Sequence, residues 1–224
     1  MKTKTAQGLV TVWLHVPPER EEEFNAWYDL EHIDQVVSIP GFTCARRYAA
    51  DGQTPKYLAW YEAVDEHVEP GAGFAQIVAH PTPWSLRIRR FYGDNRFRNN
   101  YRLVSHFGAA PQPDAPWLYA VQTDCADPAQ EAEFNDWYDN EHLPALALVP
   151  GVLRIRRYNA VSGAPKSLSA IELAAREVFE SPAWLEARNT PRTARIRALF
   201  SNARRTMYRL LLPTRLPGAT RTLT

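Results

Sequence analysis

The chain has 224 residues, of which 45% are hydrophobic and 23% are charged, and its formal net charge at pH 7 is +1. These values are ordinary for a globular protein and give no overall bias toward nucleic acid or an anionic membrane. No apolar run approaches the roughly 18 residues that a membrane-spanning helix needs, and the N-terminus lacks the apolar core of a signal peptide. Cys44 and Cys125 do not predict a disulfide framework or a metal site, so we expect a cytoplasmic protein.

The first half of the chain predicts four strands and two helical regions. Alternating residues predict strands at 9–16, 42–48, 56–64 and 100–107. The acidic stretch after Pro18 predicts a helix that ends between His32 and Ile39. A polar segment at 65–80, interrupted by Pro70-Gly71, predicts a short or broken helix, and the arginine-rich segment 83–100 is expected to be helical in part.

A proline-rich linker at 109–116 divides the chain into two predicted domains, residues 1–108 and 117–213, with a loose tail at 214–224. The second half repeats the order of the first, with strands expected at 117–125, 152–158, 166–173 and 206–212. Asp127 is the predicted N-cap of its first helix, with Pro128 at the first helical position and Gln130 as the capping-box partner. Further helical pieces are expected within 175–202.

One stretch occurs twice at a constant offset. Residues 24–48 read FNAWYDLEHIDQVVSIPGFTCARRY, and residues 134–158 read FNDWYDNEHLPALALVPGVLRIRRY. The shared frame is F-N-x-W-Y-D-x-E-H, then P-G, then R-R-Y, which indicates a duplicated module. Each half therefore has the order β-α-β-β-α-β of a ferredoxin-like repeat. We predict an α+β protein in which the two repeats pack sheet to sheet as an intrachain α+β barrel, with a cavity between the sheets.

These motifs and this element order resemble the dimeric α+β barrel superfamily in a tandem, fused form, and within it the EthD-like group. The resemblance covers nearly the whole chain. It implies a protein class that includes cofactor-free lyases, cyclases, isomerases and monooxygenases, some haem enzymes, and proteins of unknown role, so the fold alone does not choose a function. The second copy departs from the first at Pro144, which replaces Asp34. We expect this proline to end or kink its helix just past His142.

The repeated motif places a tyrosine, an aspartate and a histidine on one helix face. Tyr28 and Asp29 lie four and three residues before His32. The second copy repeats this spacing with Tyr138, Asp139 and His142. A carboxylate beside an imidazole favours its protonated form, so the set resembles a general acid/base group. The alternative is structural: Asp29 or Glu31 pairs with an arginine of the R-R-Y strand. Retention of the cluster in both copies favours that alternative.

Residues that differ between the copies predict a single site in the cavity. On the strand face opposite the alternating aliphatic residues, Trp13 corresponds to Gln122 and His15 to Asp124. The last strands add charged side chains to the predicted site, namely Arg102, His106 and Arg209. Such a cavity would suit an aromatic or acidic small molecule. The alternative is that these histidines are exposed.

The predicted function is a cofactor-independent lyase, isomerase or cyclase that acts by proton transfer on a hydrophobic or aromatic small molecule. His15, His106 or His32 would be the base, and Arg102 or Arg209 would stabilise negative charge on oxygen. Two alternatives remain open: a non-catalytic small-molecule-binding or interaction protein, and a monooxygenase of aromatic substrates.

We predict no metal and no cofactor, since no H-E-x-x-H or similar ligand spacing is present. The arginine-rich segments are expected to pair with the carboxylates of the helices, or to be exposed to solvent, rather than to bind nucleic acid. The expected partner is a small-molecule substrate, without nucleic acid or membrane. The expected state is a monomeric pseudo-dimer or a homodimer.

Overall fold

The computed structural model describes residues 6–68, 71–93, 96–110 and 114–219. The chain divides into two compact units, which we call unit 1 (Met1–Arg102 with Leu210–Thr224) and unit 2 (Leu103–Arg209). The last strand of each sequence repeat, β4 (Arg96–Gly108) and β8 (Phe200–Arg215), contributes residues to both units.

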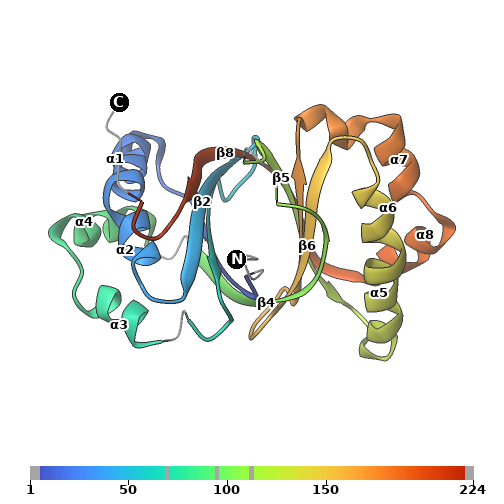
Figure 1. Cartoon of the computed structure of the whole chain (residues 1–224), viewed down its shortest axis with the longest axis horizontal. Helices are drawn as coiled ribbons and strands as arrows, with labels where there is room; N and C mark the ends of the chain where they lie inside the picture. The colour runs from blue at the N-terminus through green and yellow to red at the C-terminus, as the bar shows by residue number, and fades with distance from the viewer. Residues whose placement is uncertain (1–5, 69–70, 94–95, 111–113, 220–224) are drawn as a thin grey trace. The chain divides into compact units, whose positions relative to one another are not determined.

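Unit 1 is an antiparallel sheet with helices on one face (Figure 1). Strand β1 pairs with β3 and with β4, and β3 also pairs with β2. The complete strands are β1 (Gly8–Leu14), β2 (Phe42–Ala50) and β3 (Tyr57–Ala63). The helices are α1 (Glu21–Trp27), α2 (Ile33–Val37), α3 (Ala72–Ala79) and α4 (Pro83–Tyr92), with a 3-10 turn at Pro18–Arg20 and a π-helical turn at Tyr28–His32.

Unit 2 repeats this plan. Strand β5 pairs with β7 and β8, and β7 also pairs with β6, all antiparallel. The complete strands are β5 (Trp117–Cys125), β6 (Val152–Ala160) and β7 (Ser167–Leu173). The helices are α5 (Glu131–Trp137), α6 (Leu143–Ala147), α7 (Pro182–Arg188) and α8 (Pro191–Arg197), with 3-10 turns at Pro128–Gln130 and Arg176–Glu180 and a π-helical turn at Tyr138–His142.

The hydrogen-bonded strand order is β1-β3-β2-β8-β5-β7-β6-β4, and it closes on itself, the topology of an α+β barrel. The predicted α+β class and the β-α-β-β-α-β order of each repeat are therefore confirmed. No helix in the described part of the chain has the length and apolar character that crossing a membrane requires.

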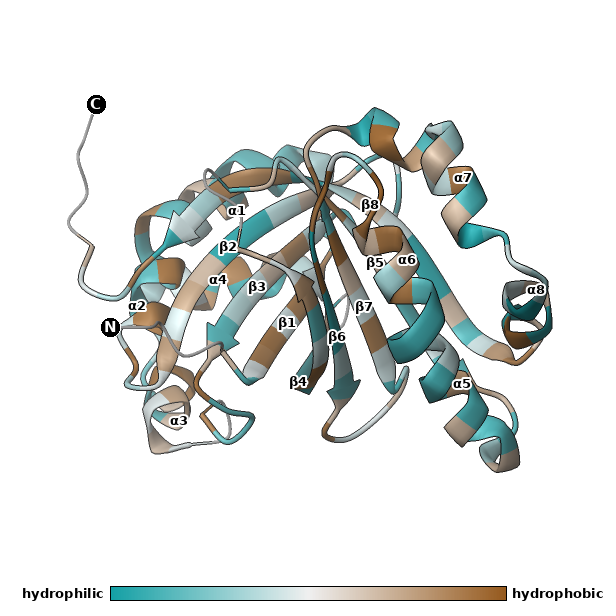
Figure 2. Ribbon diagram, turned by 45° about the vertical axis from the view of Figure 1, so that its right-hand side comes forward, coloured by the Kyte–Doolittle hydropathy of each residue, from teal (hydrophilic) through white to brown (hydrophobic). Residues whose placement is uncertain are grey.

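Each unit has its own hydrophobic core between its sheet and its helices. In unit 1 the aliphatic face of β1, with Val10 and Leu14, packs against Phe24 and Ile33. In unit 2 Phe134 and Leu143 pack against Ile155 and Ile171 of the sheet. The alternation that predicted these strands is visible in Figure 2, where β1 and β7 carry hydrophobic bands between paler ones.

Several predicted boundaries need correction. Pro144 does not end its helix, because α6 continues through it to Ala147, and the equivalent π-helical turn in unit 1 occurs without a proline. The last strands begin earlier than expected, at Arg96 and Phe200, because the arginine-rich ends of both helical segments continue the antiparallel pairing with β1 and β5.

Other local predictions hold. Asp127 caps its helix, accepting a hydrogen bond from the Ala129 amide at 2.9 Å. Gln130 contacts the cap as expected, but it donates to the Asp127 carboxylate instead of accepting from the Asp127 amide as in a capping box. The expected tail begins inside β8, and its residues 220–224 lie outside the described residues. The expected linker lies partly outside them as well, at residues 111–113. Cys44 is buried and Cys125 is half-buried.

Candidate functional site

The repeated motif forms an α-helix interrupted by a single π-helical turn. In this turn the amide of Ile33 donates to the Tyr28 carbonyl, and the amide of Leu143 donates to the Tyr138 carbonyl. Such turns are rare in proteins and occur often at functional sites. Here the turn brings the tyrosine and histidine rings together, with centroids 5.2 Å apart in unit 1 and 6.0 Å apart in unit 2.

Each motif histidine is stacked on the motif tryptophan. The ring centroids of Trp137 and His142 are 4.2 Å apart with an interplanar angle of 15°. The Trp137 indole donates a hydrogen bond to Thr193 on α8 at 3.2 Å, so two helices hold the stack in place. In unit 1 the Trp27 indole donates to Glu31 at 3.0 Å and to Ser85 at 3.2 Å. One face of each imidazole is thus covered by an aromatic wall.

The acidic residues of the motif bind the sheet and the helices of their own unit. Asp29 accepts a hydrogen bond from Arg47 at 2.5 Å, and Asp139 accepts one from Arg157 at 2.7 Å. Both arginines are nearly fully buried and belong to the R-R-Y strand. The structural alternative for the aspartates, a partner on that strand, is what the structure shows.

The glutamates of the motif likewise connect helices. Glu31 accepts a hydrogen bond from Thr82, the N-cap of α4, and Glu141 accepts one from Thr190, the N-cap of α8. These contacts tie the motif helix to the helix that follows β3 or β7. We infer that, within each unit, the acidic residues of the motif fasten the motif helix to the R-R-Y strand and to the neighbouring helix.

The motif aspartates were expected to favour the protonated form of the histidines, and this prediction is wrong, because the pKa of both histidines is lowered. Burial lowers the pKa of His32 to about 4 and that of His142 to about 3. Nearby arginines act in the same sense, since a positive charge disfavours a second one: Arg89 and Arg47 near His32, Arg197 and Arg188 near His142. Both imidazoles are therefore neutral at pH 7, and the Nδ1 atom of His142 is buried with no hydrogen-bond partner in the described part of the chain.

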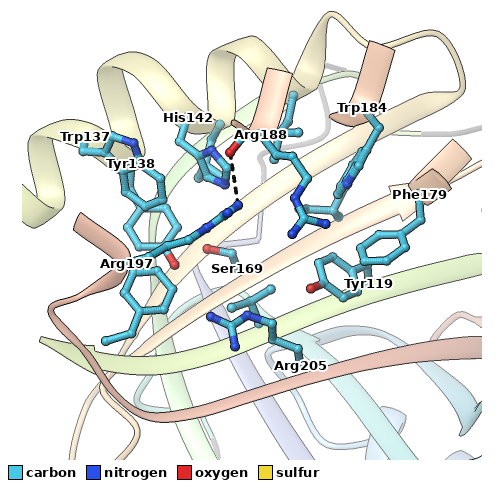
Figure 3. A pocket seen from close by; sticks show the side chains of 15 residues that line it. Tyr119, Trp137, Tyr138, His142, Ser169, Phe179, Trp184, Arg188, Arg197 and Arg205 are labelled. Atoms are coloured by element: carbon cyan, nitrogen blue, oxygen red, sulfur yellow. Dashed lines mark hydrogen bonds between the residues drawn. The ribbon is translucent and has the colours of Figure 1, made fainter. Parts of the chain in front are cut away.

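A cavity of about 230 Å³ lies beside His142, wholly within unit 2 and between its sheet and its helices. Aromatic rings form much of its wall. Figure 3 shows Tyr119, Phe179 and Trp184 along one side, with Trp137 and Tyr138 near His142. The ring centroids of Tyr119 and Phe179 are 4.6 Å apart. This size and lining suit a small, flat molecule.

Three arginines from three elements converge on the same cavity: Arg188 at the end of α7, Arg197 at the end of α8, and Arg205 on β8 (Figure 3). Arg197 donates a hydrogen bond to the Arg188 carbonyl at 3.1 Å. Across the described residues, no carboxylate forms an ion pair with any of the three. Burial lowers the pKa of Arg197, and the charges of Arg188 and Arg205 lower it further.

The cavity thus has an excess of hydrogen-bond donors and positive charge. The Nε atom of Arg188 and the indole nitrogen of Trp184 are buried without a hydrogen-bond partner among the described residues. Burial raises the pKa of Tyr119 and of Tyr138, so both phenols are neutral donors at pH 7. Buried donors without a partner, such as Arg188 Nε and the Trp184 indole, are costly unless a ligand compensates them. An aromatic molecule with an anionic oxygen would do so.

The residues that sequence reasoning placed in one cavity are dispersed over the strands. Trp13 is buried on the face of β1 that points away from the helices of unit 1, with Phe97 at 5.0 Å between ring centroids. Arg102 of β4 pairs with Gly8 of β1, so it lies on the same side of the sheet as the aliphatic residues of β1. It is exposed. Within unit 1, Trp13 and Arg102 therefore do not share a face.

The corresponding residues of unit 2 show the same pattern. Gln122 is buried, whereas Arg209 is exposed and lies opposite Trp117, which packs on the helix side of the sheet. Asp124 accepts hydrogen bonds from the Lys166 amide at 2.5 Å and from Asn202 at 2.8 Å.

The two remaining histidines differ in burial. His15 is half-buried just after β1, and His106 is exposed on β4. A catalytic or binding role for these seven strand residues stays a prediction.

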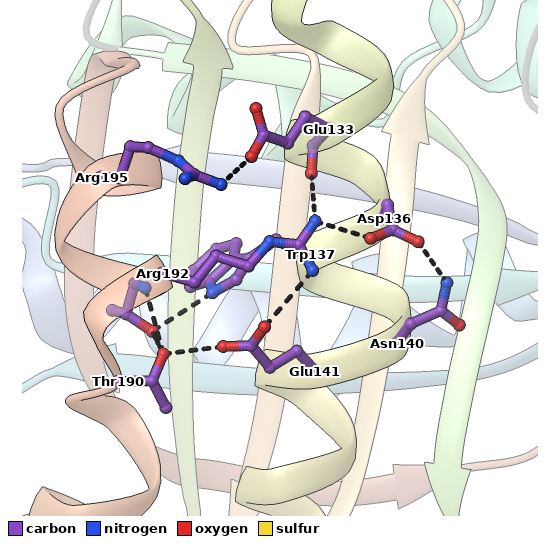
Figure 4. Close-up of polar contacts among 9 residues, drawn as sticks. Glu133, Asp136, Trp137, Asn140, Glu141, Thr190, Arg192 and Arg195 are labelled. Atoms are coloured by element: carbon purple, nitrogen blue, oxygen red, sulfur yellow. Dashed lines mark hydrogen bonds and ion pairs between the residues drawn. The ribbon is translucent and has the colours of Figure 1, made fainter.

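Sequence reasoning missed the arginines of the cavity. Arg192 and Arg195, in the same segment, do pair with helix carboxylates as expected: Arg192 with Asp136 and Glu141, and Arg195 with Glu133 (Figure 4). Arg197 faces the other way. Arg197 follows Arg192 by five positions, which on a helix is about 1.4 turns, a spacing that could have separated the two groups.

Two comparisons with known proteins return no relative: no protein-family model and no curated protein matches the sequence. The structure, however, is similar to solved structures over almost its full length. One is an anthrone oxidase-like protein, with TM-score 0.70 and 13% identity over 99% of this chain and 97% of that one. The fold is that of the dimeric α+β barrels.

Two further solved structures share this fold. A candidate monooxygenase from Fusobacterium nucleatum gives TM-score 0.64 and 9% identity over 96% of this chain and 97% of that one. A candidate monooxygenase from Lactobacillus acidophilus gives TM-score 0.57 and 11% identity over 92% and 94%. At these identities the likeness shows the fold, and function has to be argued from the cavity of unit 2.

In the described residues, no group of three or more histidine, cysteine, aspartate or glutamate side chains is placed to hold a metal ion. The cavity instead combines a neutral imidazole, two phenols and three cations. This combination can bind an organic anion, stabilise negative charge that develops on its oxygen, and accept a proton at the imidazole.

Proposed function

We propose that this chain is an enzyme that oxidises an electron-rich aromatic small molecule, bound as an anion in the cavity of unit 2. The observation that carries the proposal is the convergence of Arg188, Arg197 and Arg205, without carboxylate partners, on an aromatic cavity beside a neutral histidine. The fold shared with an anthrone oxidase-like protein and two candidate monooxygenases supports the oxidative assignment.

The chemistry follows from where charge would develop. An aromatic ketone with an acidic CH₂ group, of the anthrone type, loses a proton to form an enolate whose charge lies largely on oxygen. The arginines lower the free energy of that anion. A bound anion also favours the imidazolium form of His142, so this neutral imidazole can accept the proton. Tyr138 and Tyr119 can donate hydrogen bonds to the same oxygen.

The enolate is electron-rich enough to react with O₂, which is the oxidant. In the balanced reaction the CH₂ group becomes a second carbonyl: one oxygen atom enters the product, the other leaves as water, and O₂ accepts four electrons. The side chains of the cavity bind and orient the substrate and hold its proton and negative charge. Independence from a cofactor remains part of the proposal.

The same residues would also serve proton transfer without oxygen, as in the lyase, isomerase or cyclase first predicted from sequence. The structural neighbours favour oxidation over these reactions. The finer EthD-like resemblance has no support among them, and it stays a prediction. A non-catalytic binding protein would use the same cavity, with tight binding but no turnover.

The test is oxygen consumption and quinone absorbance with 1,8-dihydroxyanthrone as the substrate. Arg197→Met and His142→Phe should each lower kcat/KM at least tenfold. Arg195→Gln is the matched control, because Arg195 lies on the same helix but pairs with Glu133 at the surface. Wild-type rates in both cavity variants would overturn the assignment to this cavity. Substrate turnover with no oxygen uptake would replace the oxidase with a proton-transfer enzyme.

A further inference from the structure

Unit 1 contains a cavity that corresponds to the cavity of unit 2. It has a volume of about 290 Å³ and also lies between the sheet and the helices. Trp27, Tyr28 and His32 line it, and they occupy the positions that Trp137, Tyr138 and His142 occupy in unit 2. The indole of Trp27 is stacked on His32 with centroids 4.3 Å apart and an interplanar angle of 15°.

The arginines of this cavity can be matched by their structural neighbours. Thr82 caps α4 and binds Glu31, as Thr190 caps α8 and binds Glu141. Counted from these caps, Arg89 on α4 corresponds to Arg197 on α8. On the strands, Arg98 lies opposite Val12, and Arg205 lies opposite the equivalent Val121. Arg96 is a third arginine in the lining.

Two of these arginines lie against aromatic rings. The Arg96 guanidinium lies 5.8 Å from the centroid of Tyr92, and that of Arg98 lies 5.2 Å from the centroid of Phe74. Arg89 is half-buried. Throughout the described ranges, no carboxylate forms an ion pair with Arg89 or Arg96, although Arg87 on the same helix pairs with Glu23. As in unit 2, two of the arginines that line the cavity form no ion pair with a carboxylate of the described residues.

The walls of the two cavities differ chemically. Tyr92 lines the unit 1 cavity at the position where Phe200 lines the unit 2 cavity. Burial raises the pKa of Tyr92, which keeps the phenol neutral and able to donate a hydrogen bond. In unit 1 the position equivalent to Arg188 is occupied by His80, which does not line the unit 1 cavity. The unit 1 cavity therefore has the Tyr92 hydroxyl in one wall, and its third arginine is Arg96 of β4.

We infer that unit 1 holds a second ligand site, which binds an aromatic anion carrying an additional hydroxyl or carbonyl oxygen, and that the chain therefore binds two such ligands at non-identical sites. The arginines would hold the anionic group, and the Tyr92 hydroxyl would select the additional oxygen. This inference goes beyond the activity proposed for unit 2 and does not rest on it.

The experiment is a calorimetric and fluorescence titration of the intact chain with 1-anilinonaphthalene-8-sulfonate, an aromatic anion. The uncharged N-phenyl-1-naphthylamine, which has nearly the same aromatic frame, is the matched probe. Two equivalents of the sulfonate should bind per chain, at least tenfold more tightly than the uncharged probe. Equal affinity for both probes would show binding to apolar surface alone and would overturn the inference.

Arginine variants show which cavity binds each of the two equivalents of the sulfonate. Arg89→Met should remove one, Arg197→Met should remove the other, and the pair of substitutions should remove both. Arg90→Met, an exposed neighbour on α4, should retain two. If Arg89→Met lowers the melting temperature, Arg96→Met provides the same test at an exposed position.

The outcomes separate this inference from the proposed function. A single equivalent that is lost in Arg197→Met and unchanged in Arg89→Met and Arg96→Met would overturn the second site and leave the unit 2 cavity intact. Two equivalents that survive Arg89→Met and Arg96→Met would also overturn the second site. A stoichiometry that is insensitive to Arg197→Met would instead count against the cavity of unit 2.

Discussion

The imidazole of His142 lies flat against the indole of Trp137, and the same stack joins His32 to Trp27. The Trp137 indole is held in turn by Thr193, which precedes Arg197 on α8 by about one turn. The helix that supplies the central cation of the cavity thus also fixes the ring that supports the histidine. This hydrogen bond therefore couples the position of the histidine to that of the helix that carries Arg197.

Removing that hydrogen bond should destabilise unit 2. Thr193→Val keeps the shape of the side chain but leaves the buried indole N–H of Trp137 without its acceptor, a loss of about 1–3 kcal/mol in the free energy of unfolding. Thr193→Ser retains the hydroxyl and should lose less. Urea unfolding of the three proteins measures the difference. Equal stability of the valine and wild-type proteins would show that the contact contributes nothing.

The buried histidines should make stability depend on pH. Each folded-state pKa lies below the ordinary value of 6.5, near 3 for His142 and near 4 for His32. As the pH falls below about 6.5, the unfolded chain therefore takes up protons that the folded chain does not. Each histidine then lowers the free energy of unfolding by about 1.4 kcal/mol per pH unit, down to its folded pKa.

The measurement compares how steeply the free energy of unfolding falls between pH 6 and pH 4.5 in matched variants. His142→Phe retains an aromatic ring against Trp137 but cannot titrate, so its stability should fall less steeply than that of the wild type. His32→Phe should reduce the slope similarly, and the double variant should lose both contributions. Carboxylates titrate in all four proteins, and the comparison cancels them. Parallel slopes for all four would contradict the neutral, buried state of both imidazoles.

The ion pair between Arg157 and Asp139 should matter far more than those at the surface. The Arg157 side chain is 1% exposed and that of Asp139 is 27% exposed. Arg157→Met leaves the aspartate without its cation, which we expect to cost about 3 kcal/mol. Arg195→Gln breaks an exposed pair with Glu133 and should cost less than about 1 kcal/mol. Thermal and urea unfolding distinguish the two, and equal losses would refute the structural role of the motif aspartate.

The sequence was sufficient for the order of the elements because that order depends on local signals. The alternation of Val10, Val12 and Leu14 marks a strand with one face on a core, and the capping residues around Asp127 mark a helix start. The repeat then transfers each assignment from one half to the other. Pro144 misled the helix prediction because the π-helical turn before it is a property of the repeat and is also present without a proline.

The site was harder to predict because it depends on the register between strands and on side-chain direction. Arg195 and Arg197 are both arginines at the end of one short helix, yet Arg195 pairs with Glu133 and Arg197 lines the cavity. Helical spacing places the two on nearly opposite sides of α8, but only the packing of α8 against α5 decides which side faces the cavity. Similarly, the pairing of Gly8 with Arg102 decides which face that arginine occupies, and no local pattern of residues specifies this pairing.

The glycine of each P-G pair should be intolerant of a side chain. Gly151 has φ +90°, and an added Cβ would lie 2.5 Å from Val178 Cγ2. Gly163 has φ +79° but nothing within 4 Å of an added Cβ. Both alanine variants incur the conformational cost of a left-handed backbone, about 1 kcal/mol, and only Gly151→Ala adds a steric clash. We therefore expect Gly151→Ala to lower the melting temperature clearly more than Gly163→Ala, and a smaller effect at Gly151 would show that the Val178 side chain moves aside.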